Sequence, residues 1–322
     1  MALLENSIKD DEVISEETAD IAMRTYNIDP PVEKSSDLHE TSICLAQETY
    51  AKAENNEVLD CGSIHSCVDK IASQLILDNN FSLISVPGTH GDYLNSHAVN
   101  VCILSMQIGI SIGYDSYKLT ELGMSAFLHD IGMIKYLDLV RQPRKLTIEE
   151  YREIKNHPIF GAELLRKAKN LPDRAINIML QQHERMDGSG YPHGLKGEYI
   201  DQFARILNLA DTYDALTQAR SFRNQFEPNI AMKEILSLKK SFDDNVVKAF
   251  INTVGMFPVG SLVRLNNGEI GRVIRNNPES PIRPELQILY DHKKQKLEKM
   301  KVINLQKHPI FYITECLKDV KS

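Results

Sequence analysis

The sequence has no long apolar run, no excess of positive charge and no paired cysteine motif. No apolar stretch approaches the roughly 20 residues that a membrane-spanning helix needs, so we expect no membrane segment. The 322 residues carry a formal net charge of −7, whereas sequence-independent binding to nucleic acid depends on basic surface. Nucleic acid is therefore not an expected partner, and an anionic ligand would have to meet a local cluster of metal ions or arginines.

The five cysteines are scattered along the chain, odd in number and never arranged as CxxC. This usage is typical of free thiols in a reducing compartment and does not indicate a disulfide framework. The N-terminal stretch "MALLENSIKDDEVISEE" is acidic and lacks the basic start and apolar centre of a signal peptide. We therefore expect a cytoplasmic protein.

Three regions differ in composition and hydrophobic period. Residues 1–60 are acid-rich and weakly periodic, with two stretches that predict short helices but carry no chemical motif. Residues 61–257 repeat apolar positions at helical spacing. Residues 258–322 switch period: "SLVRL", the turn "NNG" and "EIGRVIR" predict a β-hairpin, and "ELQILYD" predicts a third strand. The expected fold is mainly α, a helical bundle with a short N-terminal helical region and a small C-terminal β-module.

One segment of the helical region predicts its own start and interruption. "LTIEEYREIKNHPIFGAELLRKA" begins with the Thr147 to Glu150 spacing of a capping box. The same segment should break near His157-Pro158, because proline cannot continue a helix.

Histidines and acids recur in or beside the apolar helical segments. A single His or Asp on such a helix is usually a hydrogen-bonded core residue. Several together are harder to explain in this way, because buried carboxylates are rare unless they are paired or bind a metal. A bundle can bring imidazoles and carboxylates from facing helices to one point, and a carboxylate can bridge two metals. The residues in question are His97, His129, Asp130, His157, His183 and Asp211.

Two local patterns refine this expectation. If His129 and Asp130 lie on a helix, their side chains point roughly 100° apart, so each could serve a different ion. The stretch "QQHERMDGSGYPHGL" places His183 directly before a glycine-rich turn. Glycine and proline suit any surface loop, so this stretch is either an exposed turn or one wall of an active site.

Four ordered motifs together resemble a known family. They are "HD" in "FLHDIGM", "HP" and the glycine in "HPIFG", the run "HERMDGSGYP", and "ADTYDAL" followed by "AR" and "FR". This combination resembles the HD-GYP family, a branch of the HD phosphohydrolases, from about residue 97 to residue 260. The resemblance implies a helical HD-type bundle whose metal centre hydrolyses cyclic di-GMP to pGpG and on to GMP. The nucleophile would be a hydroxide that bridges two metal ions.

The resemblance also implies roles for individual residues. Asp130 would bridge the two ions and, with His129, stand at the catalytic centre. The ions would be divalent transition metals, iron or alternatively manganese. The ligands of the first would be His97, His129, Asp130 and Asp211, and those of the second Asp130, His157 and His183. Arg220 and Arg223 match positions that contact the substrate phosphate, although a solvated helix end would explain two arginines equally well. Tyr191 would face the nucleotide or a partner protein, or pack within its loop.

Three positions depart from the family pattern. Met133 stands where the family commonly has a lysine that resembles a phosphate contact. Gln182 stands where the first of two histidines is usual, and its carbonyl would be a weaker ligand for iron or zinc than an imidazole. Tyr93 stands where some members have an acid able to hold a third metal, so two ions are expected and not three.

The departures leave a second class of function open. Instead of an enzyme, the protein could be a cyclic dinucleotide receptor, or an adaptor that engages GGDEF-type diguanylate cyclases through the GYP loop, with reduced catalysis. A third reading is hydrolysis of another cyclic dinucleotide. The set of metal ligands favours the enzyme, whereas Met133 and Gln182 favour the receptor. The sequence also leaves open whether the chain forms a homodimer.

Overall fold

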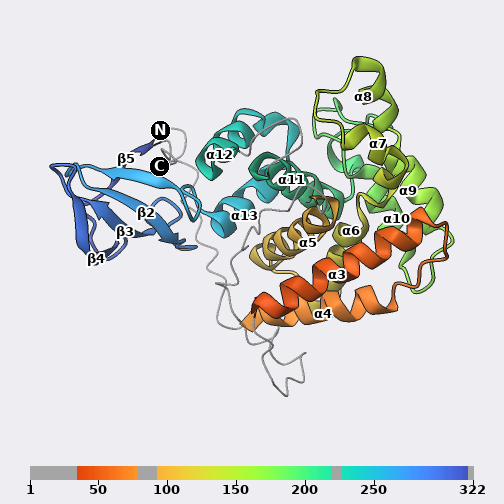
Figure 1. Cartoon of the computed structure of the whole chain (residues 1–322), viewed down its shortest axis with the longest axis horizontal. Helices are drawn as coiled ribbons and strands as arrows, with labels where there is room; N and C mark the ends of the chain where they lie inside the picture. The colour runs from red at the N-terminus through yellow and green to blue at the C-terminus, as the bar shows by residue number, and fades with distance from the viewer. Residues whose placement is uncertain (1–34, 78–92, 219–225, 318–322) are drawn as a thin grey trace.

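The computed structural model describes residues 35–77, 93–218 and 226–317, and these residues form a helical body with a five-stranded sheet at one end (Figure 1). The helices before the candidate site are α3 (Ser35–Glu54), α4 (Gly62–Leu77), α5 (Tyr93–Ile112) and α6 (Ser116–Leu128). The middle of the chain forms η1 (Ile131–Tyr136), α7 (Leu137–Val140), α8 (Ile148–Ile154), α9 (His157–Leu165), α10 (Asp173–Gln181) and η2 (Gly197–Tyr199). The body ends with α11 (Gln202–Thr217), α12 (Pro228–Ser237), η3 (Lys239–Ser241) and α13 (Asp244–Val254).

Helix α5 is the centre of the helical body. It is apolar on nearly all sides, which is the pattern of a helix surrounded by others. Helices α3, α6, α11 and α13 pack directly against it. Its buried residues join those of the surrounding helices in one continuous hydrophobic core. The mainly helical fold expected from the sequence is therefore confirmed.

The predicted start and break of the 146–168 segment are both present. The Thr147 side chain accepts a hydrogen bond from the Glu150 backbone amide, and the Glu150 carboxylate accepts one from the Thr147 amide, which completes the capping box. Helix α8 ends at Ile154, and α9 begins at His157 with Pro158 in its first turn. Pro158 suits this place, because the first amides of a helix have no intrahelical acceptor.

The sequence predicted α3 only as a short helix without a chemical motif, but this helix contributes to the hydrophobic core. Its residues Leu38, Ala46, Tyr50 and Ala53 are buried in the same core as α5. The other helical stretch predicted in the N-terminal region, "ETADIAMRTYNI", lies outside the described residues. The predicted boundaries near residues 60 and 257 stay predictions.

The C-terminal part forms an antiparallel sheet in the order β4-β3-β2-β1-β5. The predicted hairpin and third strand are confirmed as β1 (Leu262–Leu265), β2 (Ile270–Arg275) and β3 (Glu285–Tyr290). Two further strands, β4 (Lys296–Asn304) and β5 (Ile313–Leu317), were not predicted. The lysines of β4 hid its strand pattern, because a charged edge strand shows little apolar alternation.

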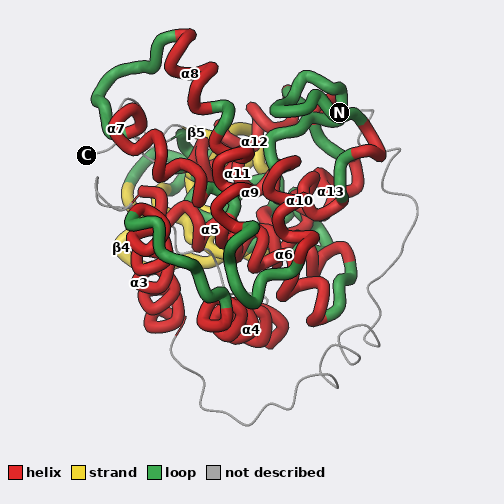
Figure 2. Tube along the Cα trace, turned by 90° about the vertical axis from the view of Figure 1, so that its right-hand side faces the viewer, coloured by secondary structure: helices red, strands yellow, loops and turns green. Residues whose placement is uncertain are grey.

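The sheet has its own small hydrophobic core and joins the body at the end of α13. The Asn276 side chain donates a hydrogen bond to the Val254 carbonyl, and the Met256 amide donates one to the Pro281 carbonyl. In the view turned by 90°, the helices lie in front and the sheet lies behind them (Figure 2). Within the described residues, no helix combines the length and apolar character needed to cross a membrane.

Candidate metal centre

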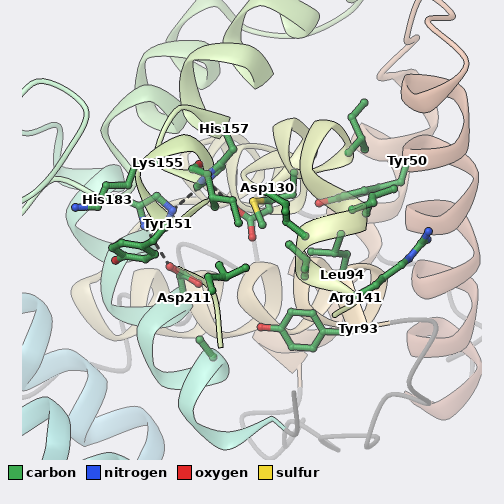
Figure 3. Close-up of a pocket in the computed structure, with 18 of the residues that line it drawn as sticks. Tyr50, Tyr93, Leu94, Asp130, Arg141, Tyr151, Lys155, His157, His183 and Asp211 are labelled. Carbon is green, nitrogen blue, oxygen red and sulfur yellow. Dashed lines mark hydrogen bonds and ion pairs between the residues drawn. The ribbon is translucent and has the colours of Figure 1, made fainter. Parts of the chain in front are cut away.

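The structure brings together the six side chains that the sequence picked out. His97 comes from α5, His129 and Asp130 follow the end of α6, and His157 begins α9. His183 follows α10, and Asp211 lies on α11. Figure 3 shows Asp130, His157, His183 and Asp211 around one cavity. Segments separated by more than 100 residues therefore meet at a single point.

Two separate groups of three possible ligands lie side by side. In the first, His97, His129 and Asp211 each offer one atom, and these atoms lie within 4.8 Å of one another. In the second, Asp130, His157 and His183 do the same. Two adjacent ion positions would require such an arrangement.

Asp130 lies between the two groups. One carboxylate oxygen, Oδ1, is 3.1 Å from Nε2 of His157. The other, Oδ2, is 3.6 Å from Nε2 of His129 and 3.7 Å from Nε2 of His97. The two oxygens thus face different groups, which is the placement that a bridging carboxylate needs.

His129 and Asp130 do not lie within the helix that the sequence predicted for them. Helix α6 stops at Leu128, His129 caps it, and Asp130 precedes η1. The expectation that the two side chains diverge as on a continuous helix was therefore wrong. The turn at the end of α6 takes Asp130 away from the helix axis toward α9. The two residues can therefore still serve different ions, although they do not lie on one continuous helix.

Three imidazoles are held with one nitrogen toward the centre. The Nδ1 atoms of His129 and His157 bond to the carbonyls of Ala126 (2.7 Å) and Ile154 (2.9 Å). A carbonyl only accepts, so each Nδ1 carries a proton, and in the neutral ring each Nε2 then presents its lone pair. Nδ1 of His97 lies 2.6 Å from a carboxylate oxygen of Asp214 and is fixed in the same way. Such outer contacts orient metal-binding histidines.

These contacts also test whether a metal ion fits. Nε2 of His157 faces Asp130 Oδ1 at 3.1 Å, and Nε2 of His97 faces Asp211 Oδ1 at 3.1 Å. At this distance each pair needs a proton or a metal cation between its two electron-rich atoms. Nε2 of His129 is buried and has no hydrogen-bond partner in the described part of the chain. Imidazole and carboxylate donors so arranged fit divalent transition-metal ions.

The charge states of Asp130 and His183 suit this donor set. Burial raises the pKa of Asp130, but the imidazoles of His129, His157 and His97 outweigh it and hold this pKa well below its usual range. Burial, with the neighbouring His157, lowers the pKa of His183 to about 3. At neutral pH the carboxylate is therefore ionised and His183 is neutral, as metal ligands must be.

The glycine-rich stretch after α10 is a wall of this site. The Tyr191 ring stacks on the His183 ring with centroids 4.7 Å apart. A Cβ on Gly190 would overlap backbone atoms of His183 and Glu184, so only glycine allows the loop to fold back so closely. The loop thus supports His183, and Tyr191 packs against a proposed ligand.

Three buried polar residues that the sequence analysis passed over hold the site in place. The Glu184 carboxylate accepts hydrogen bonds from the amides of His193 (2.7 Å) and Leu195 (2.9 Å), which fixes the loop. Asn208 donates to the Gln182 carbonyl at 2.7 Å. Asp214 orients His97, as described above. Asp214 follows Asp211 by three residues, and this helical spacing was the signal that could have revealed it.

The three departures from the family pattern have defined surroundings. Met133 is half-buried in the cavity wall. Gln182 is fully buried, and its amide nitrogen donates to the His129 carbonyl (2.8 Å) and lies 3.3 Å from Nε2 of His157. Tyr93 stacks on the His97 ring. Gln182 therefore braces the turn that carries Asp130, and its role as a ligand stays a prediction.

The cavity beside the ligands has a volume of about 1310 Å³. Its wall includes Lys155, whose amino group lies over the rings of Tyr151 (4.9 Å) and Tyr191 (5.1 Å). Arg220 and Arg223, which were predicted to contact phosphate, lie outside the described residues. The described part of the cavity nevertheless offers a positive side chain, Lys155, next to the proposed ligands.

A model of the HD domain matches residues 84–246, about half of the chain. The chain belongs to the HD domain family. A second model, of a KOW domain associated with the HD domain, matches residues 262–321, which include the strands of the sheet.

Curated relatives identify the branch. The chain is 30% identical to a cyclic di-GMP phosphodiesterase of Pseudomonas aeruginosa over 75% of this chain and 59% of the relative. It is 30% identical to the cyclic di-GMP phosphodiesterase PdeB of Borreliella burgdorferi over 61% of this chain and 53% of the relative. These matches confirm the resemblance to HD-GYP phosphodiesterases. The chain spans between about half and three-fifths of the length of these two relatives.

A solved structure supports the fold. The HDG"Y"P protein Bd1817 from Bdellovibrio bacteriovorus superimposes with a TM-score of 0.57 at 21% identity, covering 73% of this chain and 76% of that one. The HD-type helical bundle expected from the sequence is thereby confirmed.

Proposed function

We propose that the chain is a metal-dependent phosphodiesterase that hydrolyses cyclic di-GMP to pGpG and on to GMP. The observation that carries the proposal is the position of Asp130 between two groups of ligands, with one oxygen toward each. The named activity of the two curated relatives supports the choice of substrate.

The proposed centre holds two divalent ions, iron or alternatively manganese. His97, His129 and Asp211 would hold the first, His157 and His183 the second, and Asp130 both. When bound, such ions lower the pKa of a water molecule and neutralise charge that grows on the phosphoryl oxygens.

The protein's own residues would orient the reacting groups. Asp214 and the carbonyls of Ala126 and Ile154 fix three imidazoles before substrate arrives, so little rearrangement is needed. The half-buried Lys155 supplies positive charge at the wall where Met133 supplies none. Arg220 and Arg223 stay predicted phosphate contacts.

The test is to incubate iron- or manganese-loaded protein with cyclic di-GMP and follow pGpG by chromatography. Elemental analysis of protein purified without chelator should give close to two transition-metal ions per chain. Ordered protein that takes up neither metal and releases no pGpG would contradict the proposal.

A cyclic dinucleotide receptor is the second candidate, and the neutral Met133 in the cavity wall favours it. In that case the protein would bind cyclic di-GMP without releasing pGpG. The same candidate includes docking of a GGDEF-type cyclase on the GYP loop, where Asp187, Ser189 and His193 are exposed. Co-purification with such a cyclase, lost on substituting these residues, would support it.

The proposal also covers the cellular location and the oligomeric state of the protein. All five cysteines are free thiols, which supports placement in the cytoplasm. We also propose that the chain forms a homodimer, which light scattering would test.

A further inference from the structure

The cavity continues past the proposed ligands onto helix α3, which lies outside the residues matched by the HD domain model. Gln47, Tyr50, Ala51 and Glu54 line it from this helix. Their spacing of three, four and seven residues from the first places them on one helix face. A helix from outside the matched region therefore supplies part of the wall around the proposed centre.

Tyr50 is the buried member of this face. It is only 6% exposed, and its hydroxyl is buried without a hydrogen-bond partner in the part of the chain that the structure describes. Figure 3 shows the ring reaching in from α3, with its oxygen directed toward Asp130. Burial, with the charge of Asp130, raises the pKa of this phenol well above its usual range. An unsatisfied buried hydroxyl destabilises the folded protein, and its presence is explained if a ligand completes the hydrogen bond.

Helix α3 makes polar contacts with both neighbouring helices, α5 and α4. Nε2 of His39 lies 3.3 Å from the Asn100 side-chain oxygen on α5, and the Ser42 hydroxyl lies 3.2 Å from the Cys67 sulfur on α4. Helix α3 also contacts η1, which directly follows Asp130. The phenol is thus anchored to the same elements that position the carboxylate.

We propose that Tyr50 donates a hydrogen bond to a phosphoryl oxygen of the nucleotide bound at the Asp130 centre. A phenol is a donor at neutral pH, because its ordinary pKa is about 10. Negative charge grows on the phosphoryl oxygens during hydrolysis, so a fixed donor there stabilises the transition state. This inference rests on the proposed function and adds a catalytic residue from outside the matched family region.

The test compares Tyr50→Phe with Tyr114→Phe. Tyr114 also has a buried hydroxyl without a hydrogen-bond partner among the described residues, but it packs on Phe203 and does not line the cavity. Both changes remove one oxygen and keep the ring. Metal content, melting temperature, steady-state kinetics with cyclic di-GMP and calorimetric binding of pGpG would be measured for each.

For Tyr50→Phe we expect kcat/KM to fall about tenfold to a hundredfold, the effect of losing one hydrogen bond to a charged group. Binding of pGpG should weaken in the same variant, while metal content and melting temperature stay unchanged. Tyr114→Phe should match the wild type in kinetics and binding.

Three results would contradict either the inference about Tyr50 or the proposed function, and they can be told apart. If Tyr50→Phe equals Tyr114→Phe in both kinetics and pGpG binding while the wild type is active, the inference alone is overturned. Loss of metal from Tyr50→Phe would also overturn it, because the hydroxyl would then act on the centre and not on the nucleotide. Wild-type protein that neither turns over cyclic di-GMP nor binds pGpG would contradict the proposed function, and the inference with it.

Discussion

The backbone of Gly132 packs directly against the backbone of Gly161, and a Cβ on Gly132 would overlap the carbonyl oxygen of His157. Both glycines belong to motifs recognised in the sequence, "HDIG" and "HPIFG". The close approach of these two backbone segments places Asp130 beside His157. The glycines are therefore needed for the distance between two proposed ligands.

Gly132→Ala should separate the turn after α6 from α9. We expect a loss of about 1–3 kcal/mol in the free energy of unfolding, because an added methyl group meets backbone that cannot move aside. Metal content should also fall, since Asp130 and His157 no longer meet. Gly62→Ala is the control, because its Cβ would meet only the ends of the Asp60 and Asn170 side chains. Urea unfolding and elemental analysis check both variants, and equal behaviour would refute the account.

Asp130→Ala should remove most bound metal and all activity, because this carboxylate faces both groups of ligands. His183→Ala should behave differently, since His183 belongs only to the second group. We expect it to lower the metal content from about two ions to about one. Elemental analysis of the two variants under identical loading decides the matter, and the same metal content in both would argue against a bridging Asp130.

Asp214→Asn should weaken metal binding without adding or removing a ligand. The carboxylate accepts the Nδ1 proton of His97, and loss of such an outer partner typically costs 10- to 100-fold in metal affinity. Asp138→Asn, on the exposed side of α7, removes the same charge without altering this contact and should change nothing. Competition with a fluorescent chelator measures both affinities. An unchanged affinity in Asp214→Asn would mean that the histidine needs no such support.

Met133→Lys should improve catalysis. The side chain lines the cavity and is only half-buried, so a lysine amino group can reach water and a phosphate. One added charge-assisted contact is worth roughly 1.5–3 kcal/mol, or about tenfold to a hundredfold in affinity or rate. Met133→Leu provides a neutral control of similar size. Lower melting temperature with no kinetic gain would show instead that the position belongs to the core.

The sequence could single out the six side chains that the structure brings together, because their chemistry is local and their motifs are short. His97, His129, His157, His183 and Asp211 each stand out as a polar residue in an apolar segment. It could not reveal Tyr50, because a tyrosine with apolar neighbours on a weakly periodic helix looks like any core residue. Nor did it indicate β4, whose lysines break the alternation by which strands are recognised. Both depend on which distant element packs alongside, and that information is not local.

Helix α11 presents Asn208, Asp211 and Asp214 at intervals of three residues, and each holds a different part of the centre. Asn208 binds the carbonyl before His183, Asp211 faces Nε2 of His97, and Asp214 faces Nδ1 of that same ring. The candidate ligand Asp211, the outer partner Asp214 and the support of the turn before His183 therefore share one helix, so a displacement of α11 would reach all three contacts together.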